Sequence, residues 1–335
     1  MKTIKFIILS TISILLVSCF SANYKVVTHI NRNGSGWREI QTTVSKSDSI
    51  TDLFPYNLSN GWKILQMDSA DKKNVKISKN FNSIENLSTD LRSDKIFPVA
   101  KESLQKHFRW FYTYYDFKAI YSEIKEKGDV SLDKYLNKTE QKFYLQGDMS
   151  AYKGMNGIEL QNVLDDIERR FMKWYQRSIY EENFDVILYF SDVDFQSKLT
   201  AVKDTLYSIY DLEKQENIDF KDVCAALDKY FSTDIFTKLL NQKEKEMHNM
   251  LDERQKTVEA LLNYNIQYQI ALPGKILSSN TDLTKDGVLK WNVNLYRFLA
   301  DDYTLTAKSR TTNYWAFAVT LLLILFSLYA LIRKK

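Results

Sequence analysis

Residues 264–274 read YNIQYQIALPG and decide how this chain folds. From Tyr264 to Leu272 every second side chain is large and apolar, and mostly polar residues stand between them. A period of two is typical of a β-strand with one buried face and one solvent-facing side. Pro273 and Gly274 then end the strand, because both favour turns over regular structure. The segment is decisive because the residues before it follow a different period.

The preceding residues, 131–262, repeat their apolar side chains at helical spacing, with charged residues on the opposite faces. In the last stripe the spacing alternates between four and seven, which predicts a bundle helix packed on another helix. Residues 185–190 fit a buried helical turn and a strand equally well. The three stripes are Val163, Leu164, Ile167, Phe171, Trp174 and Tyr175; Leu199, Val202, Leu206, Ile209 and Tyr210; and Phe236, Leu240, Met247, Leu251, Val258 and Leu262.

A period of two also marks the early part of the chain. Residues 24–31 alternate, the turn residues 33–36 read NGSG, and residues 37–44 are rich in strand formers, so we predict a hairpin. Further short strands are expected at 62–67, 74–78, 289–296 and 303–308. The most aromatic tract, Phe108–Phe117, carries rings on both alternating faces and predicts one strand covered on both sides. An aromatic binding platform is the alternative interpretation of this tract.

Strands at both ends of the chain and helices between them predict an α+β fold. We expect one antiparallel β-sheet built from residues 24–125 and 264–309, with a long, mostly helical insertion between its two parts. In terms of domains, residues 19–130 form the N-terminal β-rich half and residues 131–262 the helical insertion. Residues 263–313 supply the C-terminal strands that complete the sheet.

The first residues carry an export signal. Lys2 and Lys5 precede the apolar run Phe6–Val17, which is too short to span a membrane, so residues 1–18 read as a signal peptide. They end in LVSC at residues 16–19, which resembles the lipobox of bacterial lipoproteins. In that family the cysteine is lipidated and becomes the first mature residue, so Cys19 is the predicted lipidation site. An ordinary signal peptide with an incidental cysteine is the alternative.

The last residues carry a second membrane element. Tyr314–Ile332 contains no charge and would span about 28 Å as a helix, which matches the hydrocarbon core of a bilayer. Tyr314 and Trp315 suit the membrane interface, and the basic tail 333–335 marks the cytoplasmic end. We therefore expect a transmembrane helix at 314–332 in the cytoplasmic membrane. Residues 20–313 would then lie on its outer face, and the C-terminus in the cytoplasm.

Two late sequence segments are similar to a known family. Residues 272–276 (LPGKI), Ser279-Asn280 and residues 287–291 (GVLKW) resemble the late strands of the LppM-like membrane lipoprotein domains of bacteria. The lipobox, the early hairpin and the terminal helix with its basic residues resemble that family too. The likeness covers the β parts, about half of the chain, and the long helical segment is a departure from it. The resemblance implies an envelope-facing, membrane-tethered domain and supplies no catalytic residues.

The remaining residues show no pattern of an enzyme. The motifs of serine hydrolases, zinc proteases, phosphate loops, dinucleotide-binding folds and paired C-x-x-C sites are absent from the sequence. His29, His107 and His248 lie far apart, and the acidic pairs Asp165-Asp166 and Asp301-Asp302 have the character of solvated surface groups. No metal and no cofactor is expected. Cys224 lies in an apolar helical stretch and reads as a small buried hydrophobe.

The charge distribution excludes a nucleic-acid partner. Without Lys2, Lys5 and the three terminal cations, 41 of the 46 basic residues remain against 42 acidic ones, a net charge of −1 with no basic stripe. We expect a membrane-tethered envelope lipoprotein that acts as a non-catalytic binding or assembly module for a protein or lipid partner. The alternative is a hydrolase of envelope polymers that uses scattered carboxylates. An apolar pocket in the sheet would favour a lipid, and a packed core with an exposed helical patch a protein.

Overall fold

The computed structural model describes residues 22–45, 50, 53–68, 72–92, 96–124, 130–210, 218–262, 264–281 and 284–333. Cys19 and the predicted signal peptide at 1–18 lie outside these residues. The chain divides into two compact units. One unit holds residues 1–122, 260–295 and 302–335, and its strands are called the sandwich here. The other holds residues 123–259 and 296–301 and is called the helical unit.

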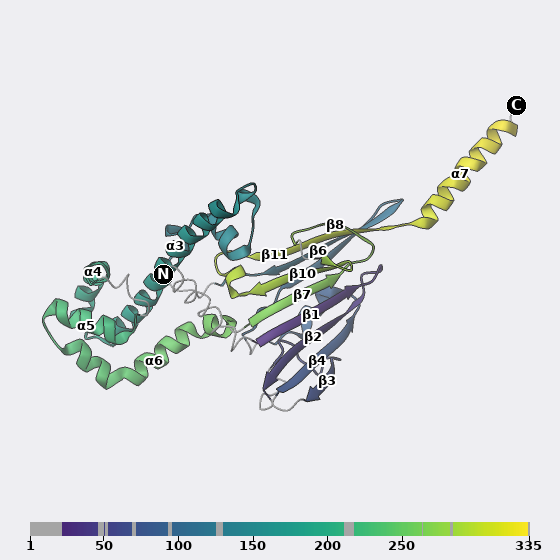
Figure 1. The fold of residues 1–335 in the computed structure, drawn as a ribbon. Coiled ribbons are helices and arrows are strands. Elements are labelled where there is room, and N and C mark those ends of the chain that lie inside the picture. Colours follow the sequence, from purple (N-terminus) through teal and green to yellow (C-terminus); the bar gives the residue numbers. More distant parts are fainter. Residues whose placement is uncertain are drawn as a thin grey trace. The chain divides into compact units, whose positions relative to one another are not determined.

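The larger sheet of the sandwich has seven strands in the order β3-β4-β2-β1-β7-β10-β9 (Figure 1). Strands from both chain ends lie side by side in it, since the N-terminal β1 pairs with β7, the segment at 264–271. Alternate side chains are buried along β1, β4, β7 and β10, as the period of two predicts. The bounds are β1 Ala22–Ile30, β2 Gly36–Ser45, β3 Lys63–Asp68, β4 Lys72–Phe81, β7 Tyr264–Ala271, β9 Thr284–Lys285 and β10 Val288–Asn294.

The smaller sheet has four strands in the order β5-β6-β11-β8, with bounds β5 Lys101–Phe108, β6 Tyr112–Tyr121, β8 Lys275–Ser279 and β11 Tyr303–Thr312. A short 3-10 helix, Ile84–Asp90, lies between β4 and β5 in the chain. The Phe117 ring of this sheet stacks on Tyr268 of the larger one, with ring centroids 6.1 Å apart. The two sheets therefore bury their apolar faces against each other.

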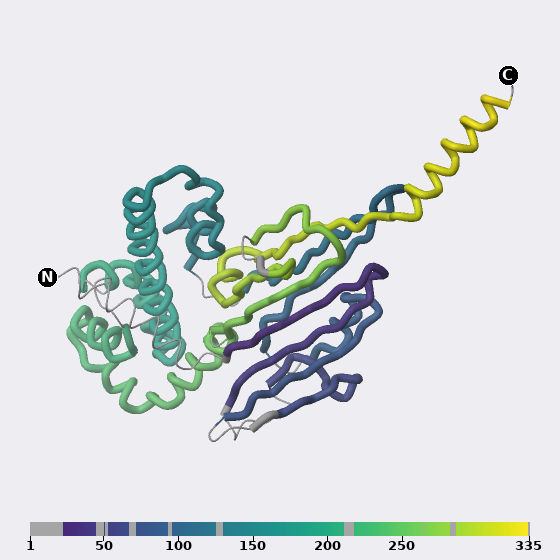
Figure 2. The backbone as a smooth tube through the Cα atoms, turned by 45° about the vertical axis from the view of Figure 1, so that its right-hand side comes forward, coloured from purple at the N-terminus to yellow at the C-terminus, as the bar shows by residue number. Residues whose placement is uncertain are grey.

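The predicted α+β class is confirmed, but the expectation of one antiparallel sheet is wrong in two respects. Two sheets form instead of one, because alternating strands expose a whole apolar face that a second sheet can cover. In addition, β1 and β7 pair in parallel along eight positions, from Ala22 beside Tyr264 to His29 beside Ala271. Figure 2 shows the two tubes, purple and green, running together. A parallel pair needs a long crossover, and the residues between these strands supply it.

The prediction of a single strand at Phe108–Phe117 is also wrong. The chain turns at Arg109–Phe111, where the backbone of Arg109 and Tyr112 exchanges two hydrogen bonds of 2.7 and 3.2 Å. Phe108 and Trp110 are exposed, whereas Tyr115 and Phe117 are buried in the sandwich. Aromatic residues at both odd and even positions are typical of a strand that is covered on both faces. A hairpin with an exposed aromatic turn gives the same sequence pattern, so the pattern does not distinguish the two structures.

In its described residues, the helical unit contains four principal helices: α3 Gly157–Phe190, α4 Val193–Ile209, α5 Phe220–Phe231 and α6 Ile235–Leu262. The ambiguous residues 185–190 belong to α3. An apolar core forms where these helices meet, around Tyr180, Phe184, Leu206 and Leu227 together with Phe236 and Met247 of the predicted α6 stripe. Asn156 caps α3 and exchanges hydrogen bonds with Glu159 in a capping box, which fixes where this long helix begins.

Short helices complete this unit around a second core. They are 3-10 helices at Leu132–Lys134, Ser150–Tyr152 and Leu295–Phe298, α2 at Lys138–Gln141 and a π-helix at Lys142–Gln146. Phe171 and Trp174 of α3 pack here with Leu299 and Ala300. The expected strand alternation therefore stops at Leu295 instead of continuing through Tyr296, because Leu299 and Ala300 bury their side chains in this helical core.

The last helix, α7, spans Tyr314–Arg333 and follows β11 after the single residue Asn313. It is the one candidate membrane span in the part of the chain that the structure describes. Its most apolar window has a mean hydropathy of 2.4, and 6% of that window is buried. A helix this apolar with almost no cover from its own chain differs from the core helix of a soluble protein.

Candidate functional site

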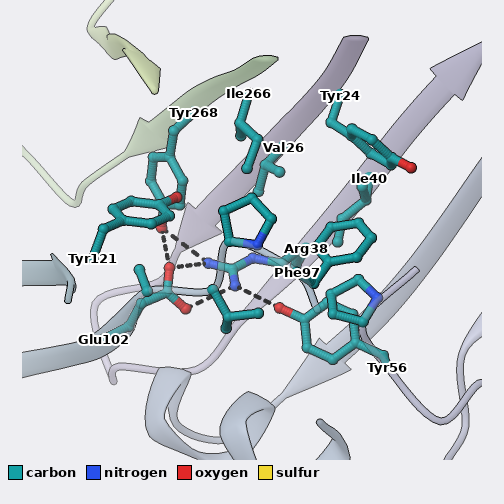
Figure 3. A pocket seen from close by; sticks show the side chains of 14 residues that line it. Tyr24, Val26, Arg38, Ile40, Tyr56, Phe97, Glu102, Tyr121, Ile266 and Tyr268 are labelled. Carbon is teal, nitrogen blue, oxygen red and sulfur yellow. Dashed lines mark hydrogen bonds and ion pairs between the residues drawn. The ribbon is translucent and has the colours of Figure 1, made fainter. Parts of the chain in front are cut away.

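The candidate functional site is a charged cluster in the interior of the sandwich (Figure 3). The Arg38 guanidinium of β2 and the Glu102 carboxylate of β5 form a bidentate pair, with N–O distances of 2.7 and 2.6 Å. Their side chains are 3% and 7% exposed. Since β2 and β5 belong to different sheets, the ion pair joins the two layers of the sandwich.

The strand register brings the other polar groups to this pair. Arg38 stands opposite Thr28 of β1, and its Nε donates to the Thr28 hydroxyl at 3.0 Å. Arg38 also donates from Nη2 to the Tyr268 hydroxyl at 2.9 Å. Tyr268 lies on β7 and donates in turn to Glu102 Oε1 at 2.5 Å. The strand at 264–271 thus contributes to the cluster because Tyr268 falls on its buried phase.

The guanidinium has no donor left for a ligand. A guanidinium carries five N–H groups, and Arg38 uses them on Thr28, on both Glu102 oxygens, on Tyr268 and, at 3.5 Å, on the Tyr56 hydroxyl. An anion could bind here only by displacing one of these partners. The cluster therefore fastens the two sheets together and does not have the donor geometry of an anion-binding site.

The electrostatics of the cluster move the pKa values of its arginine and tyrosines further from neutral pH. Burial disfavours the charge of Arg38, yet the Glu102 carboxylate holds the pKa of Arg38 well above its ordinary value. Burial raises the pKa of Tyr56, Tyr121 and Tyr268 above that of a free phenol. A general acid or base works best with a pKa near the working pH. The tyrosines act here as neutral hydrogen-bonding groups.

A small cavity adjoins the cluster. Its volume is about 40 Å³, and Tyr24, Phe97 and Ile266 are among its walls. A buried water needs roughly 10–15 Å³ of such space, so the cavity has room for a few water molecules. Small-molecule pockets measure about 300–1,000 Å³, and an acyl chain needs far more room than this cavity offers. The cavity is therefore too small to serve as a lipid pocket.

A second depression of about 440 Å³ crosses the smaller sheet and is called the polar groove here, because most of its lining residues are polar. Asp116 is the one carboxylate among its lining residues, and its oxygens lie 3.6 Å from both His107 Nε2 and Lys308 Nζ. Hydrolysis of a glycosidic bond ordinarily needs two carboxyl groups flanking it. The groove does not supply that pair. Its walls are Ser103, Gln105, Asp116, Phe117, Lys118, Ser278, Ser279, Asn280, Thr306, Ala307 and Lys308.

The histidines and acidic pairs considered from the sequence do not assemble into a site. His29 stacks on Trp37, His107 faces Asp116 and His248 meets the edge of Phe220. Asp165 accepts from Gln161, and Asp166 pairs with Arg169 and Arg170 on the same helix. Within the described ranges, no group of three His, Cys, Asp or Glu side chains could hold a metal ion.

Cys224 is 1% exposed in the core of the helical unit. Burial raises the pKa of its thiol to about 12, which disfavours the nucleophilic thiolate. The side chain therefore packs as a small hydrophobe. Cys19, the predicted lipidation site, lies outside the described residues and remains a prediction.

Arg38 and Glu102 are not among the residues that the sequence pattern predicts for a site. One signal was available, because Arg38 shares its alternation phase with Ile40 and Thr42, which are buried in the sandwich. A charged residue on the buried face of a strand requires a partner of opposite charge. Glu102 gave no matching signal, since the strand that carries it was not predicted.

Comparison with known proteins yields one weak structural likeness. The NMR structure of the folded domain of LppM from Mycobacterium tuberculosis aligns with 88% of this chain and 91% of its own, at 9% sequence identity and a TM-score of 0.31. No family model matches this chain, and no curated protein sequence matches it. The resemblance to LppM-like domains seen in the sequence is thus found again in the structure, as a weak similarity without consequences for function.

Proposed function

We propose that this protein is a membrane-tethered envelope lipoprotein whose exported part is a non-catalytic binding or assembly module, with a protein as its partner. The observation that carries the tether is α7. Its 20 residues span about 30 Å, and side chains all round it are exposed, including Phe326 at 69% and Ile332 at 75%. The predicted orientation places the helical unit and the sandwich on the outer face of the cytoplasmic membrane.

A protein partner is favoured over a lipid by the contrast between the cavity and the helical unit. The cavity beside Arg38 is too small for an acyl chain, and the larger groove on the smaller sheet is lined mostly by polar residues. In the helical unit, the α3–α4 turn and the α5–α6 turn lie together, because Phe195 meets the rings of Phe231 and Phe236 at 6.1 and 5.8 Å. Four large side chains stand exposed on these turns. They are Tyr189 at 64%, Val193 at 80%, Tyr230 at 39% and Ile235 at 43%, called here the apolar end.

The apolar end has the composition of a protein interface. Exposed apolar side chains gathered in one place mark interaction sites more often than scattered ones do. Tyrosine is enriched at interaction hot spots, where it contributes a large contact area and a hydroxyl group. Asp192, Asp194 and Lys229 are exposed on or beside the same turns and would form a polar rim.

The competing hydrolase of envelope polymers lacks support from the carboxylates. A catalytic acid typically has a raised pKa. Among the described carboxyl groups with a shifted pKa, the shift is downward in every case, through hydrogen bonds or ion pairs for Glu140, Asp148 and Asp166 and likewise for Glu85, Asp234 and Glu246. Such groups are ionised acceptors, as on an ordinary protein surface.

The test compares two similarly exposed residues: Val193, the first residue of α4 just beyond the end of α3, and Ile158, in the first turn of α3. Val193→Asp would place a charge in the apolar end, and Ile158→Asp a charge at the start of α3, where Ile158 is 77% exposed. The two sites are separated by roughly 50 Å of helix. We expect the first variant to lose the protein's function in the cell envelope. It should also no longer co-purify with a defined partner. The second should leave both unchanged.

Asp116→Asn distinguishes the competing function. The binding-module proposal is wrong if Asp116→Asn abolishes function while Val193→Asp keeps both its function and its co-purifying partner. The polar groove would then be the functional site. Circular dichroism of each variant in detergent confirms that the helices persist.

A further inference from the structure

The turn between β5 and β6 carries an exposed aromatic cluster that the proposed binding module does not use. Its residues, Phe108, Arg109, Trp110 and Phe111, are called the aromatic tip. Phe108 is 58% exposed and Trp110 45%. Exposed aromatic rings gathered on one tight turn are unfavourable in water, because each ring presents a large apolar area.

The aromatic tip packs against the first turns of α7. The Phe108 ring stacks on Trp315 with centroids 6.2 Å apart, and the Trp110 ring meets Trp315 edge-on at 5.3 Å. Phe111 contacts Phe317, with centroids 4.6 Å apart. The tip and the beginning of α7 thus form one continuous aromatic surface. Trp315 and Phe317 remain 52% and 44% exposed on it.

Several polar groups of this surface find their partners within the protein. Asn313, which links β11 to α7, donates from its side chain to the carbonyls of Arg109 and Trp110, and from its backbone to that of Phe111. Its side-chain oxygen accepts from Thr113 at 3.0 Å. The Trp110 indole donates to the Thr320 hydroxyl at 2.9 Å. In hydrocarbon every such group must find its partner within the protein.

The position of Thr320 sets the depth of the tip. This step rests on the proposed membrane insertion of α7. The 20 residues of α7 rise about 30 Å, the whole thickness of a hydrocarbon core, so Tyr314 must lie near its outer boundary. Thr320 follows six residues later and therefore lies roughly 9 Å deeper. A ring bonded to Thr320 cannot stay outside the bilayer.

We propose that the aromatic tip is a second membrane-inserting element, which enters the outer leaflet beside α7 and holds the sandwich against the lipid surface. Tryptophan and tyrosine favour the membrane interface, where the ring is buried and the polar edge finds a partner. The Trp110 indole lies deeper and finds its partner in the Thr320 hydroxyl. Arg109 is exposed on the tip and is long enough to return its guanidinium to the lipid phosphates. The occupant of this surface is therefore the bilayer that holds α7.

The test uses the full chain reconstituted into vesicles of phosphatidylcholine and phosphatidylglycerol, with acyl chains brominated near the headgroup so that they quench nearby indoles. The chain has six tryptophans. We expect Trp110→Phe and Trp315→Phe each to remove about half of the quenchable emission, because these two indoles contact lipid. Trp291→Phe is the control. Trp291 is 2% exposed inside the sandwich, so its loss should raise the quenched fraction.

The outcomes separate this inference from the tether itself. If Trp315→Phe removes quenching and Trp110→Phe does not, α7 is inserted but the aromatic tip is outside the bilayer, and the inference is overturned. If the wild-type protein shows no quenching at all, the tether has failed as well. Trp110→Phe keeps a ring in place, and the near-ultraviolet circular dichroism of each variant checks that the sandwich stays folded. A tip covered by another protein would give the first of these results.

Discussion

The sandwich and the helical unit differ in where they place their charges. In the sandwich, Arg38 and Glu102 are buried together between two sheets. In the helical unit the core is apolar, and a network of half-buried charges lies at its edge. Arg177 pairs there with Glu181 and Asp204, and Lys203 pairs with Asp185 at 2.7 Å and with Glu181. Water can replace a partner at this edge, whereas it cannot do so inside the sandwich.

The two regions also differ in how far apart in the sequence their contacting residues lie. Asn265 donates to Asn23 across 242 positions, and Arg38 to Tyr268 across 230. Among the four long helices of the helical unit, α3 to α6, and their connections, the corresponding bonds join Tyr180 to Lys203 across 23 positions and Asn183 to Ile218 across 35. Long-range pairing must overcome more loop-closure entropy, so we expect the sandwich to fold more slowly than the helical unit.

The largest expected effect comes from breaking the buried ion pair. Glu102→Ala leaves the Arg38 charge in the sandwich without its counter-ion and should cost about 3–5 kcal/mol. Asp185→Ala removes a half-exposed partner of Lys203 in the helical unit and should cost less than about 1 kcal/mol. Hydrogen exchange of β1, β2 and β7 reports the first change, and exchange of α3 and α4 the second.

The double variant Arg38→Met with Glu102→Leu sharpens this prediction. Replacing both members of a buried pair by apolar residues is often neutral, so much of the lost stability should return. Equal losses in the single and double variants would contradict the view that the unpaired charge causes the damage.

A cavity in the helical unit tests whether the two regions open independently. Leu227 is completely buried on α5, and Leu227→Ala should cost about 2–5 kcal/mol through lost contacts and a cavity. Amides of α3, α5 and α6 should then exchange faster. The strands of the sandwich should keep their wild-type exchange rates, and a parallel acceleration in β1 and β7 would show that the two regions unfold together.

Two glycines with nearly the same backbone conformation test how closely the sandwich is packed. Gly274 and Gly61 have φ angles of +79° and +82°. An added Cβ at Gly274 would lie 2.2 Å from the Arg310 carbonyl oxygen, and one at Gly61 would meet nothing within 4 Å. Gly61→Ala should cost about 1–2 kcal/mol for its left-handed conformation. Gly274→Ala should cost more in a denaturant titration, because β11 must also move away.

The smallest expected effect is a loss of stability of the helical unit in acid. Hydrogen bonds from Arg170 to both oxygens of Glu140, at 2.6 and 3.0 Å, lower the pKa of this carboxyl in the folded protein. The Glu140 carboxylate therefore contributes its full stabilisation of the folded protein above the pKa of the unfolded chain, about 4.3. This stabilisation is lost as the pH falls through the lower pKa of the folded protein. Thermal unfolding of Glu140→Gln should show a shallower loss below about pH 4 than wild type. If the unfolding temperature falls equally steeply with pH in both proteins, Glu140 does not cause the loss of stability in acid.

Regular strands and helices could be predicted from the sequence wherever one face of an element is buried. The alternation at 264–272 matches β7, and the apolar stripes of residues 163–175 and 236–262 lie on α3 and α6. The prediction failed at Phe108–Phe117, where a turn joins two strands that share aromatic composition. It also failed for the candidate site, because Arg38 and Glu102 meet only when two separate sheets come face to face.

The sequence by itself determined the α+β class, the helical segment between early and late strands, and the apolar α7, since local periodicity and hydropathy encode these features. Tertiary structure alone decided that two sheets form, that β1 and β7 run in parallel, and that Arg38 finds Glu102 between the layers. It also decided that Trp110 reaches Thr320 of α7, 210 positions away. Periodicity states which face of an element is buried, but the identity of the surface that covers it depends on contacts between residues far apart in the chain.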